Sequence, residues 1–388
     1  MKLTFYSNFL NHHHIPLCNY FYKVLGDNFK FVAVEQVPQE RISLGYMTDF
    51  SLYPYLIESY LSKDEYSRAI ELGLSSDAVI IGSSHEVFIK ERISLNKLTF
   101  RYSERLFKKG IRYLFHPKAI FKRYELDTRL RYKNVWMLSS SAYTPWDFSF
   151  YFAYPNRFIK WGYFPETISY NVDEVINRKN NDIYSFLWVG RFLDWKRPMQ
   201  AIQLVEKLVE QGYPAKLDMI GIGKELEELK SYVKSKNLNE TIKFHGSKTP
   251  EEVRTFMLKS KYFLFTSNRG EGWGAVLNEA MNSMCVVFAY YQIGSAPYLI
   301  DHLKDGVMYK NTKDLHKLVV NLLENSSLQE SIAKNAYYKI TRVWSHEIAA
   351  ERFLIFSKEL LKQKICFFEN GPLSKAKRIS ERKVRHEL

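Results

Sequence analysis

The chain has 388 residues, which is too long for one ordinary domain core, so we expect two domains. Its hydrophobic fraction of 46% and charged fraction of 25% are those of a soluble globular protein, and it has no run of about 18 apolar residues that would span a bilayer. We therefore do not expect an integral membrane protein. Cys18, Cys285 and Cys366 are too few and too scattered for a disulfide framework or a zinc knuckle.

The N-terminal half alternates strands and helices. The first strand is expected over Leu3–Ser7, and Asn8, Asn11 and three histidines follow it where a signal peptide needs an unbroken apolar core, so we expect an uncleaved, cytoplasmic chain. Further strands are expected over 29–34, 78–81, 98–102 and 135–138, and helices over 54–72 and 103–110. This pattern predicts a doubly wound, Rossmann-like domain over 1–165.

The net charge of +14 is concentrated in two regions. Residues 101–134 hold eleven Lys and Arg against three acidic residues, and residues 371–388 hold six against two. Such regional charge suits a polyanion, either an anionic lipid surface or a nucleic acid. The alternatives are a solvated basic face for 101–134 and a disordered basic tail for 371–388.

The C-terminal half has a clearer alternation of strands and helices. Strands are expected over 184–190, 216–221, 241–246, 262–266 and 286–290, with amphipathic helices between them. Thr249, Pro250 and Glu252 supply a helix cap, a first-turn proline and a capping-box acid. We expect a second Rossmann-like domain over 183–345, a linker over 166–182, and a helix over 346–370 that packs back toward the N-terminal domain. Ligands of such α/β sheets bind beyond the carboxyl ends of the strands.

Cations follow the first strand of this second domain. Arg191, Lys196 and Arg197 come after Gly190 and lead into a helix. Guanidinium groups bind a diphosphate through two parallel hydrogen bonds, and an ammonium group binds it as a point charge. These cations predict a phosphate site, and the alternative is a helix start with solvated charges.

A glycine-rich segment follows another strand of the same domain. Gly270, Gly272 and Gly274 allow backbone N–H groups to approach a ligand, and the helix expected near Trp273 adds its positive end. Glu271 and Glu279 are eight residues apart, which on a helix places them near one face. A carboxylate here repels phosphate, so we expect it to bind sugar or ribose hydroxyl groups; for Glu279 alone, a solvated helix position is the alternative.

Taken together and in order, these motifs resemble the donor-binding domain of retaining GT-B glycosyltransferases, the family 4 or group 1 type that includes bacterial enzymes of envelope polysaccharide assembly. The resemblance runs from about Leu187 to Tyr309. It implies a GT-B fold, in which two doubly wound domains face a central cleft. It also implies a nucleotide-sugar donor as substrate, with no cofactor and no metal, because cations and a helix end replace the metal of an Asp-x-Asp motif.

The resemblance also implies roles for individual residues. Arg191 and Lys196 would bind the donor diphosphate and stabilise the leaving group, with Glu271 as the third catalytic residue. Glu279 would bind the ribose. The remaining donor-binding positions are Gly190, Gly221, Gly223, Gly272, Trp273 and Gly274.

The N-terminal domain departs from the family at one position. Family members often carry a histidine after a strand in the middle of this domain, near the donor sugar, but the matching region 100–105 has none. Ser103 or Glu104 stands in that place and is therefore a candidate for a sugar contact.

Histidines elsewhere in this domain are further candidates for acceptor or donor contact. His13 lies among three adjacent histidines after the first strand, where the family has a glycine-rich loop. The three do not suit one metal ion, because neighbouring side chains point apart in an extended chain. His85 and His116 are other candidates, although a structural role is the favoured interpretation of each.

We therefore predict a retaining glycosyltransferase that moves a hexose from a UDP- or GDP-sugar to a saccharide or lipid-linked acceptor. Bacterial surface polysaccharide biosynthesis is its expected setting, in the cytoplasm or peripherally on the inner face of the membrane, where the basic region and its interleaved Leu106, Phe115, Ile120 and Phe121 would meet anionic lipid. The alternative is a non-catalytic two-domain protein that binds a nucleotide or sugar. No recognised nucleic-acid-binding module is visible, so nucleic acid is not an expected partner.

Overall fold

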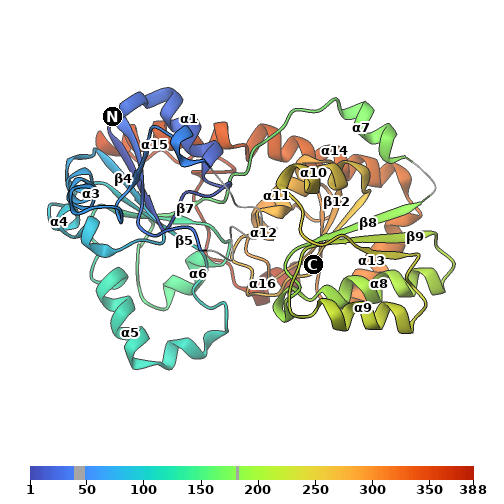
Figure 1. Cartoon of the computed structure of the whole chain (residues 1–388). Helices are drawn as coiled ribbons and strands as arrows, with labels where there is room; N and C mark the ends of the chain where they lie inside the picture. Colours follow the sequence, from blue (N-terminus) through green and yellow to red (C-terminus); the bar gives the residue numbers. More distant parts are fainter. Residues whose placement is uncertain (39–48, 181–182) are drawn as a thin grey trace. The chain divides into compact units, whose positions relative to one another are not determined.

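The computed structural model describes residues 1–38, 49–180 and 183–388, and Figure 1 shows how its helices and strands are arranged. The chain forms two compact units: unit 1 comprises Met1–Glu166 and Val343–Ile379, and unit 2 comprises Thr167–Arg342 and Ser380–Leu388. Within the described ranges, none of the helices combines the length and the apolar character that a membrane crossing requires.

Unit 1 contains a sheet of seven parallel strands in the order β3-β2-β1-β4-β5-β6-β7. The strands are β1 (Leu3–Ser7), β2 (Phe29–Ala33), β3 (Leu56–Glu58), β4 (Ala78–Ile81), β5 (Thr99–Ser103), β6 (Val135–Ser139) and β7 (Phe158–Lys160). The five strands expected here are present within one residue of their expected bounds. The two that were not expected, β3 and β7, have three residues each.

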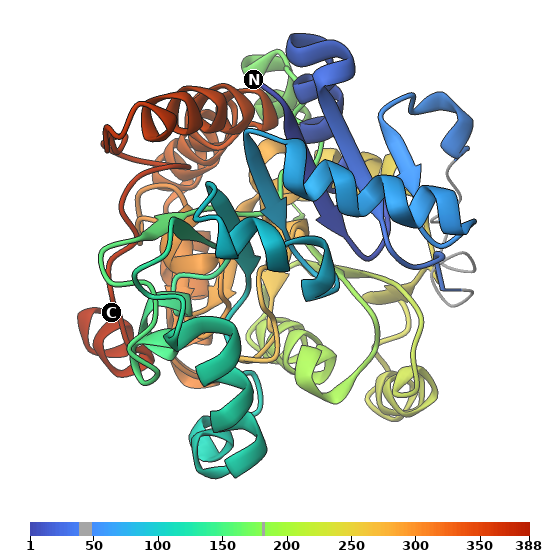
Figure 2. The same ribbon diagram turned by 90° about the vertical axis from the view of Figure 1, so that its left-hand side faces the viewer.

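Helices cover both faces of this sheet, and Figure 2 views unit 1 from a second direction. On one face, Phe353 of α15 (His346–Leu361) contacts Phe21 of α1 (Ile15–Leu25) and Phe100 of β5. On the other face, the Tyr6 hydroxyl donates to the Ala69 carbonyl of α3 (Lys63–Ser75) at 2.6 Å. Successive side chains of each strand point to opposite faces of the sheet, so the strands pack against a helical layer on both faces.

Of the two helix predictions in unit 1, one began too early and the other was wrong. Residues 54–72 contain β3 before α3, and α3 begins at Lys63 because the Ser62 side chain caps it by accepting from the Glu65 N–H at 3.0 Å. Residues 103–110 form no helix, and the Phe107 N–H instead donates to the buried Asp147 carboxylate at 2.9 Å. The remaining helices of unit 1 are short: α4 (Lys90–Ser94), α5 (Pro117–Arg123) and α6 (Thr144–Ser149).

Unit 2 contains a sheet of six parallel strands in the order β10-β9-β8-β11-β12-β13. The strands are β8 (Tyr184–Val189), β9 (Ala215–Ile220), β10 (Ile242–Phe244), β11 (Tyr262–Phe265), β12 (Val286–Tyr290) and β13 (Val307–Tyr309). This is the order of doubly wound dinucleotide-binding domains, in which the chain changes direction between the first and the fourth strand. The two doubly wound units confirm the prediction of a GT-B fold with two Rossmann-like domains.

The helices of unit 2 lie on both faces of its sheet, as Figure 1 shows. One face is covered by α8 (Pro198–Glu210), α9 (Leu226–Ser235) and α13 (Thr312–Leu323). The other is covered by α7 (Val172–Lys179), α10 (Pro250–Lys259) and α11 (Val276–Asn282). The shorter α12 (Ala296–Leu299) follows β12, and the long α14 (Ser326–Val343) follows α13. Helix α7 lies within the residues expected to be a linker, and its Lys179 is buried.

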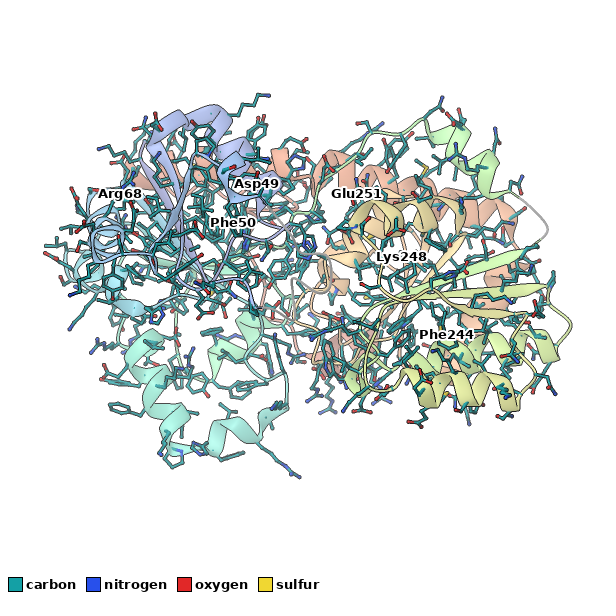
Figure 3. All side chains as sticks on the ribbon, in the orientation of Figure 1. Asp49, Phe50, Arg68, Phe244, Lys248 and Glu251 are labelled. Atoms are coloured by element: carbon teal, nitrogen blue, oxygen red, sulfur yellow. The ribbon has the colours of Figure 1, made fainter. Side chains whose placement is uncertain are left out.

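The capping signal before α10 has the predicted geometry. The Glu252 N–H donates to the Thr249 hydroxyl at 3.3 Å, and the Thr249 N–H donates to the Glu252 carboxylate at 2.9 Å. Figure 3 labels Lys248 and Glu251, the residues that flank Thr249 and Pro250 at this helix start. The local sequence is sufficient to predict this helix start, because both capping partners lie within one helical turn.

The basic C-terminal residues are ordered, which differs from the disordered tail considered above. Leu373 and Ala376 are buried in unit 1, where Lys375 forms a bridge with Ile159 of β7. From Ser380 onward the chain belongs to unit 2 and forms α16 (Glu381–Glu387), which buries Val384. The buried side chains of Leu373, Ala376 and Val384 therefore anchor residues 371–388 to the two units.

Candidate functional site

The point where unit 2 changes its winding direction lies between β8 and β11, which are neighbours in the sheet. Helix α8 follows β8 on one face and α11 follows β11 on the other, so the two strand-to-helix loops diverge beyond the carboxyl edge of the sheet. Such a divergence is where open α/β sheets bind ligands. The loop after β8 contains 190–197, and the loop after β11 contains 266–275.

Lys196 and Glu271 join these two loops. The Lys196 ammonium forms an ion pair with one carboxylate oxygen of Glu271, and the two side chains are only 14% and 11% exposed. The Ser267 hydroxyl donates to the same oxygen at 2.9 Å. The ammonium also lies 4.6 Å from the centre of the Trp195 ring. A carboxylate and an aromatic face thus hold one cation at the edge of the sheet.

Further hydrogen bonds fix the loops to each other. The Thr266 hydroxyl donates to the Lys196 carbonyl at 2.6 Å and accepts from the Trp188 indole at 3.0 Å. The Asn268 N–H donates to the Trp195 carbonyl at 2.9 Å. Both loops therefore behave as one preorganised unit around the ion pair.

Three glycines of the predicted set are required by the backbone, and one of them is Gly223, where a Cβ would lie 2.4 Å from the Phe192 carbonyl oxygen. Gly274 has a φ of 83°, and a Cβ there would lie 2.3 Å from the Phe265 ring. Gly221 has a φ of 138°, and a Cβ there would lie 1.9 Å from the Gly190 carbonyl oxygen. Side chains at these positions would push the loops apart, so the glycines permit the close approach of the backbone.

Trp273 supports the glycine-rich loop from the protein interior. Its side chain is fully buried, and its indole N–H donates to the Asn278 side chain at 2.9 Å. The Ser295 hydroxyl donates to its carbonyl at 2.6 Å. Gly272 beside it is also buried. The Trp273 side chain thus packs in the interior, and the donor-binding role of Gly272, Trp273 and Gly274 stays a prediction.

The helix after this loop begins later than the sequence suggested. Helix α11 starts at Val276, because Gly274 in the left-handed region interrupts the chain after Trp273. Glu271 therefore lies in a turn, and the helical spacing assumed between Glu271 and Glu279 does not apply. Glu279 sits within α11, where burial raises the pKa of its carboxyl to about 7 and nearby Arg254 opposes the shift.

The two arginines of the loop after β8 differ in setting. Arg191 is half-buried directly beyond β8. Arg197 has a left-handed backbone with a φ of 52°, and its guanidinium lies 4.8 Å from the centre of the Tyr290 ring. Tyr290, at the end of β12, thus covers one face of the Arg197 guanidinium. Arg191 and Lys196 lie in the same loop after β8, at the β8–β11 edge.

In unit 1, the structure brings two predicted residues, His13 and Glu104, together through Tyr163. The His13 ring stacks on the Tyr163 ring at 5.9 Å, and the Tyr163 hydroxyl donates to the Glu104 carboxylate at 2.7 Å. The Ser103 hydroxyl donates to the Glu104 carbonyl at 2.9 Å. The neighbouring His14 is buried, which lowers the pKa of its ring to about 4 and keeps it neutral.

The other two histidines lie apart from this group. His85 is exposed, and its ring lies 6.4 Å from that of Phe88. His116 is exposed and caps the start of α5 without a side-chain hydrogen bond to the helix. Neither is joined to Tyr163 or Glu104 by a contact that the structure shows among the described residues.

The family of unit 2 follows from its sequence. Residues 171–339 match the model of the family described as Glycosyl transferases group 1. This chain carries a domain of that family. The matched residues contain all six strands of unit 2 and both loops at the β8–β11 edge, so the Lys196–Glu271 pair lies within the group 1 domain.

A curated relative supports the same family. The poly(glycerol-phosphate) alpha-glucosyltransferase of Bacillus subtilis (strain 168) is 20% identical over 204 residues, which are 52% of this chain and 30% of the relative. This chain thus spans about a third of the length of that relative.

Solved structures share the fold along almost the whole chain. Anabaena Alr3699/HepE in complex with UDP has a TM-score of 0.68 at 13% identity, covering 94% of this chain and 100% of its own. A glycosyltransferase from Rickettsia africae ESF-5 has a TM-score of 0.65 at 14% identity, with coverages of 94% and 99%. WaaG, a glycosyltransferase involved in lipopolysaccharide biosynthesis, has a TM-score of 0.58 at 16% identity, with coverages of 90% and 98%.

Sequence reasoning missed several residues that shape these sites. Ser267 and Thr266 bind partners in the loops, and Tyr163 links His13 to Glu104. Thr266 and its partner Lys196 are 70 residues apart, and Tyr163 and Glu104 are 59 apart. No local pattern encodes such pairings, although Asn268 before Gly270 indicates the tight turn in which the Gly270 N–H donates to the Asn268 side chain at 2.8 Å.

Proposed function

We propose that this protein is a retaining glycosyltransferase that transfers a hexose from a UDP- or GDP-sugar to a saccharide or lipid-linked acceptor in bacterial surface polysaccharide biosynthesis. The observation that carries the proposal is the Lys196–Glu271 pair, which a group 1 domain holds at the carboxyl edge of its sheet. We further propose that it acts in the cytoplasm, with acceptors presented at the inner face of the membrane.

Arg191 and Lys196 would bind the donor diphosphate. As the bond between the sugar and the diphosphate breaks, negative charge grows on the departing phosphate oxygen, and two fixed cations stabilise it without reorganisation. Glu271 and Ser267 hold the Lys196 ammonium in place, so Glu271 would position the cation, while Glu279 would accept hydrogen bonds from ribose hydroxyl groups. The acceptor hydroxyl oxygen would bond to the anomeric carbon on the same face from which the diphosphate departs, and the departing phosphate would take the hydroxyl proton, so the configuration is retained. This assignment uses side chains of the protein and no cofactor.

UDP is the nucleotide to test first, because HepE was solved with UDP and also with UDP and glucose. The His13, Tyr163 and Glu104 group of unit 1 would then contact the transferred sugar or the acceptor. Its ring face and its carboxylate suit a saccharide, which packs its C–H face on aromatic rings and donates hydroxyl hydrogen bonds.

The test is a thermal-shift comparison of UDP, GDP and ADP, followed by a transfer assay with the matching sugars. A nucleotide at about 100 times its Kd adds about 2.7 kcal/mol of stability, so binding gives a clear rise in Tm. Arg191→Ala should abolish the rise, whereas Lys234→Ala, which removes an exposed cation of α9, should leave it unchanged.

The outcomes separate the two candidate functions. A Tm rise that Arg191→Ala retains would show that the donor site lies elsewhere. Nucleotide binding without either transfer or slow donor hydrolysis would instead favour a non-catalytic receptor for a nucleotide or sugar.

A further inference from the structure

The basic region 101–134 divides into an internal part and an exposed part. Arg101 and Arg105 are buried: Arg101 forms two hydrogen bonds of 2.7 Å with Glu86, and Arg105 lies 3.5 Å from the Asp147 carboxylate. Arg123 pairs with the buried Asp127 at 2.9 Å. These cations balance internal acids and are not available to a polyanion.

The exposed part surrounds α5. Lys109, Arg112, Lys118 and Lys122 are exposed, and none of them has an acidic partner among the described residues. They lie on η4 (Ile111–Phe115), on α5 or beside them. We define this set, together with the apolar residues of the same segment, as the α5 surface.

Large apolar side chains are exposed between these cations. Phe115 is 79% exposed and Phe121 is 67% exposed, and both are surrounded in sequence by the lysines of the α5 surface. The other exposed apolar or aromatic members are Ile111, Ile120, Tyr124 and Tyr132. Leu106, which was predicted to meet lipid, is only partly exposed and lies before the segment. Six exposed side chains of this kind between positions 111 and 132 are more than the scattered apolar residues that a solvated face carries.

The base of the segment is fixed while its tip is open. Asp127 accepts from the Tyr154 hydroxyl at 2.5 Å, and the Thr128 hydroxyl donates to the Tyr151 carbonyl at 2.7 Å. Ala119 is the residue that α5 buries. In both ribbon views α5 projects away from the sheet of unit 1 (Figures 1 and 2). The contacts of Asp127 and Thr128 therefore anchor this segment to unit 1, and α5 is left accessible to a partner.

We propose that the α5 surface binds an anionic lipid bilayer, with Phe115 and Phe121 entering the interface and the four cations facing the headgroups. Phenylalanine and isoleucine side chains gain by leaving water for the acyl boundary, and cations gain near anionic headgroups. A nucleic acid would use the charge but leave the isoleucines and the helix tip exposed, so the combined chemistry favours lipid. The inference stands apart from sugar transfer, since lipid binding is measured without a donor or an acceptor.

The test is co-sedimentation of the full chain with vesicles of phosphatidylglycerol or of phosphatidylcholine at low ionic strength. Phosphatidylglycerol vesicles should retain the protein, phosphatidylcholine vesicles should retain far less, and salt at about 0.5 M should release most of it. Each cation contributes about fivefold to partitioning, so Lys118→Glu combined with Lys122→Glu should lower it by more than about tenfold.

A second pair of variants tests the apolar contribution. Phe115→Ser combined with Phe121→Ser should lower partitioning by at least about tenfold and keep the same Tm, because both side chains are exposed. The matched controls are Lys313→Glu, which reverses an exposed cation of α13, and Leu61→Ser, which removes an exposed apolar side chain elsewhere in unit 1; neither should change partitioning.

Three results would overturn the proposal. The first is a lack of binding to phosphatidylglycerol vesicles at low ionic strength. The second is equal binding by the wild type and both double variants. The third is tight binding to a single-stranded oligonucleotide with none to vesicles, which would assign the surface to nucleic acid.

Discussion

Glu279 has a carboxyl group whose charge changes in the neutral pH range, because burial raises its pKa from the ordinary value of 4.5 to about 7. A folded-state pKa above the unfolded value means that the folded protein holds the proton more tightly. The resulting stability is fully present below about pH 4.5 and is lost as the pH rises through 7.

We expect the free energy of unfolding of the wild type, relative to Glu279→Gln, to fall by about 2 kcal/mol between pH 5 and pH 8.5. Urea unfolding at both pH values measures this difference. UDP should flatten the wild-type profile if ribose hydroxyl groups bind the carboxylate, since hydrogen bonds to the charged form lower its pKa. Parallel pH profiles for the two proteins would contradict the assignment of the titration to Glu279.

The Lys196–Glu271 pair makes a second prediction for single residues. Both side chains are nearly buried, so Lys196→Met leaves a desolvated carboxylate with Ser267 as its remaining donor. We expect a loss of about 3 kcal/mol in the free energy of unfolding, most of which Glu271→Gln should restore in the double variant.

Urea denaturation of the single and double variants measures this coupling. Lys230→Met is the matched control, because the ion pair of Lys230 with Glu227 is exposed. Its loss should lower the free energy of unfolding by less than about 0.5 kcal/mol. If the double variant is as unstable as Lys196→Met alone, the loss comes from the lysine packing and the two charges are not coupled.

At the scale of elements, the C-terminal helix α16 contacts the loops of the candidate site. The Glu381 carboxylate accepts from Arg269 and from Gln292, each at 2.6 Å. Arg269 belongs to the glycine-rich loop after β11, and Gln292 follows β12. A segment distant in sequence thus holds the loop that carries Glu271.

Glu381→Ala should loosen this loop and lower the affinity for UDP by about 1 kcal/mol, roughly fivefold, with little change in Tm. Titration calorimetry measures the affinity, and faster amide hydrogen exchange over 268–274 reports the loop directly. Glu387→Ala, which removes an exposed acid of the same helix, should have neither effect. Unchanged exchange in Glu381→Ala would show that α16 does not order the loop.

At the scale of the whole molecule, each unit has its own parallel sheet, and the chain crosses between the units three times, after Glu166, Arg342 and Ile379. Each unit therefore combines segments that are distant in sequence. Two sheets, each with its own core, predict two components in thermal unfolding.

Scanning calorimetry should resolve two components, and UDP should raise the midpoint of one of them, because the proposed donor loops lie in unit 2 alone. At about 100 times its Kd, UDP adds about 2.7 kcal/mol to the unit that binds it. A single transition whose calorimetric and van't Hoff enthalpies agree, both with and without UDP, would show that the two units unfold as one.

The sequence by itself determined the fold class, most strands and the start of α10. Apolar strands and amphipathic helices have local periods, and the Thr249–Glu252 cap closes within one turn. The strands β3, β7 and β13 were not predicted; each has three residues, whereas β10, which is equally short, was predicted because apolar and polar residues alternate within 241–246. The predicted start of α11, near Trp273, was too early, since the helix begins at Val276. A side chain at position 274 would clash with the Phe265 ring on the preceding strand, and this contact cannot be read from the local sequence.

Only the tertiary structure decided which of the predicted residues act together. It joined Lys196 to Glu271 across 75 residues, gave Trp273 a buried partner and connected His13 to Glu104 through Tyr163. It also divided the basic region into internal pairs and the exposed α5 surface. Composition and spacing record which charges a chain carries, but burial and pairing arise when distant segments pack, so the folded chain alone determines which charges remain available to a ligand.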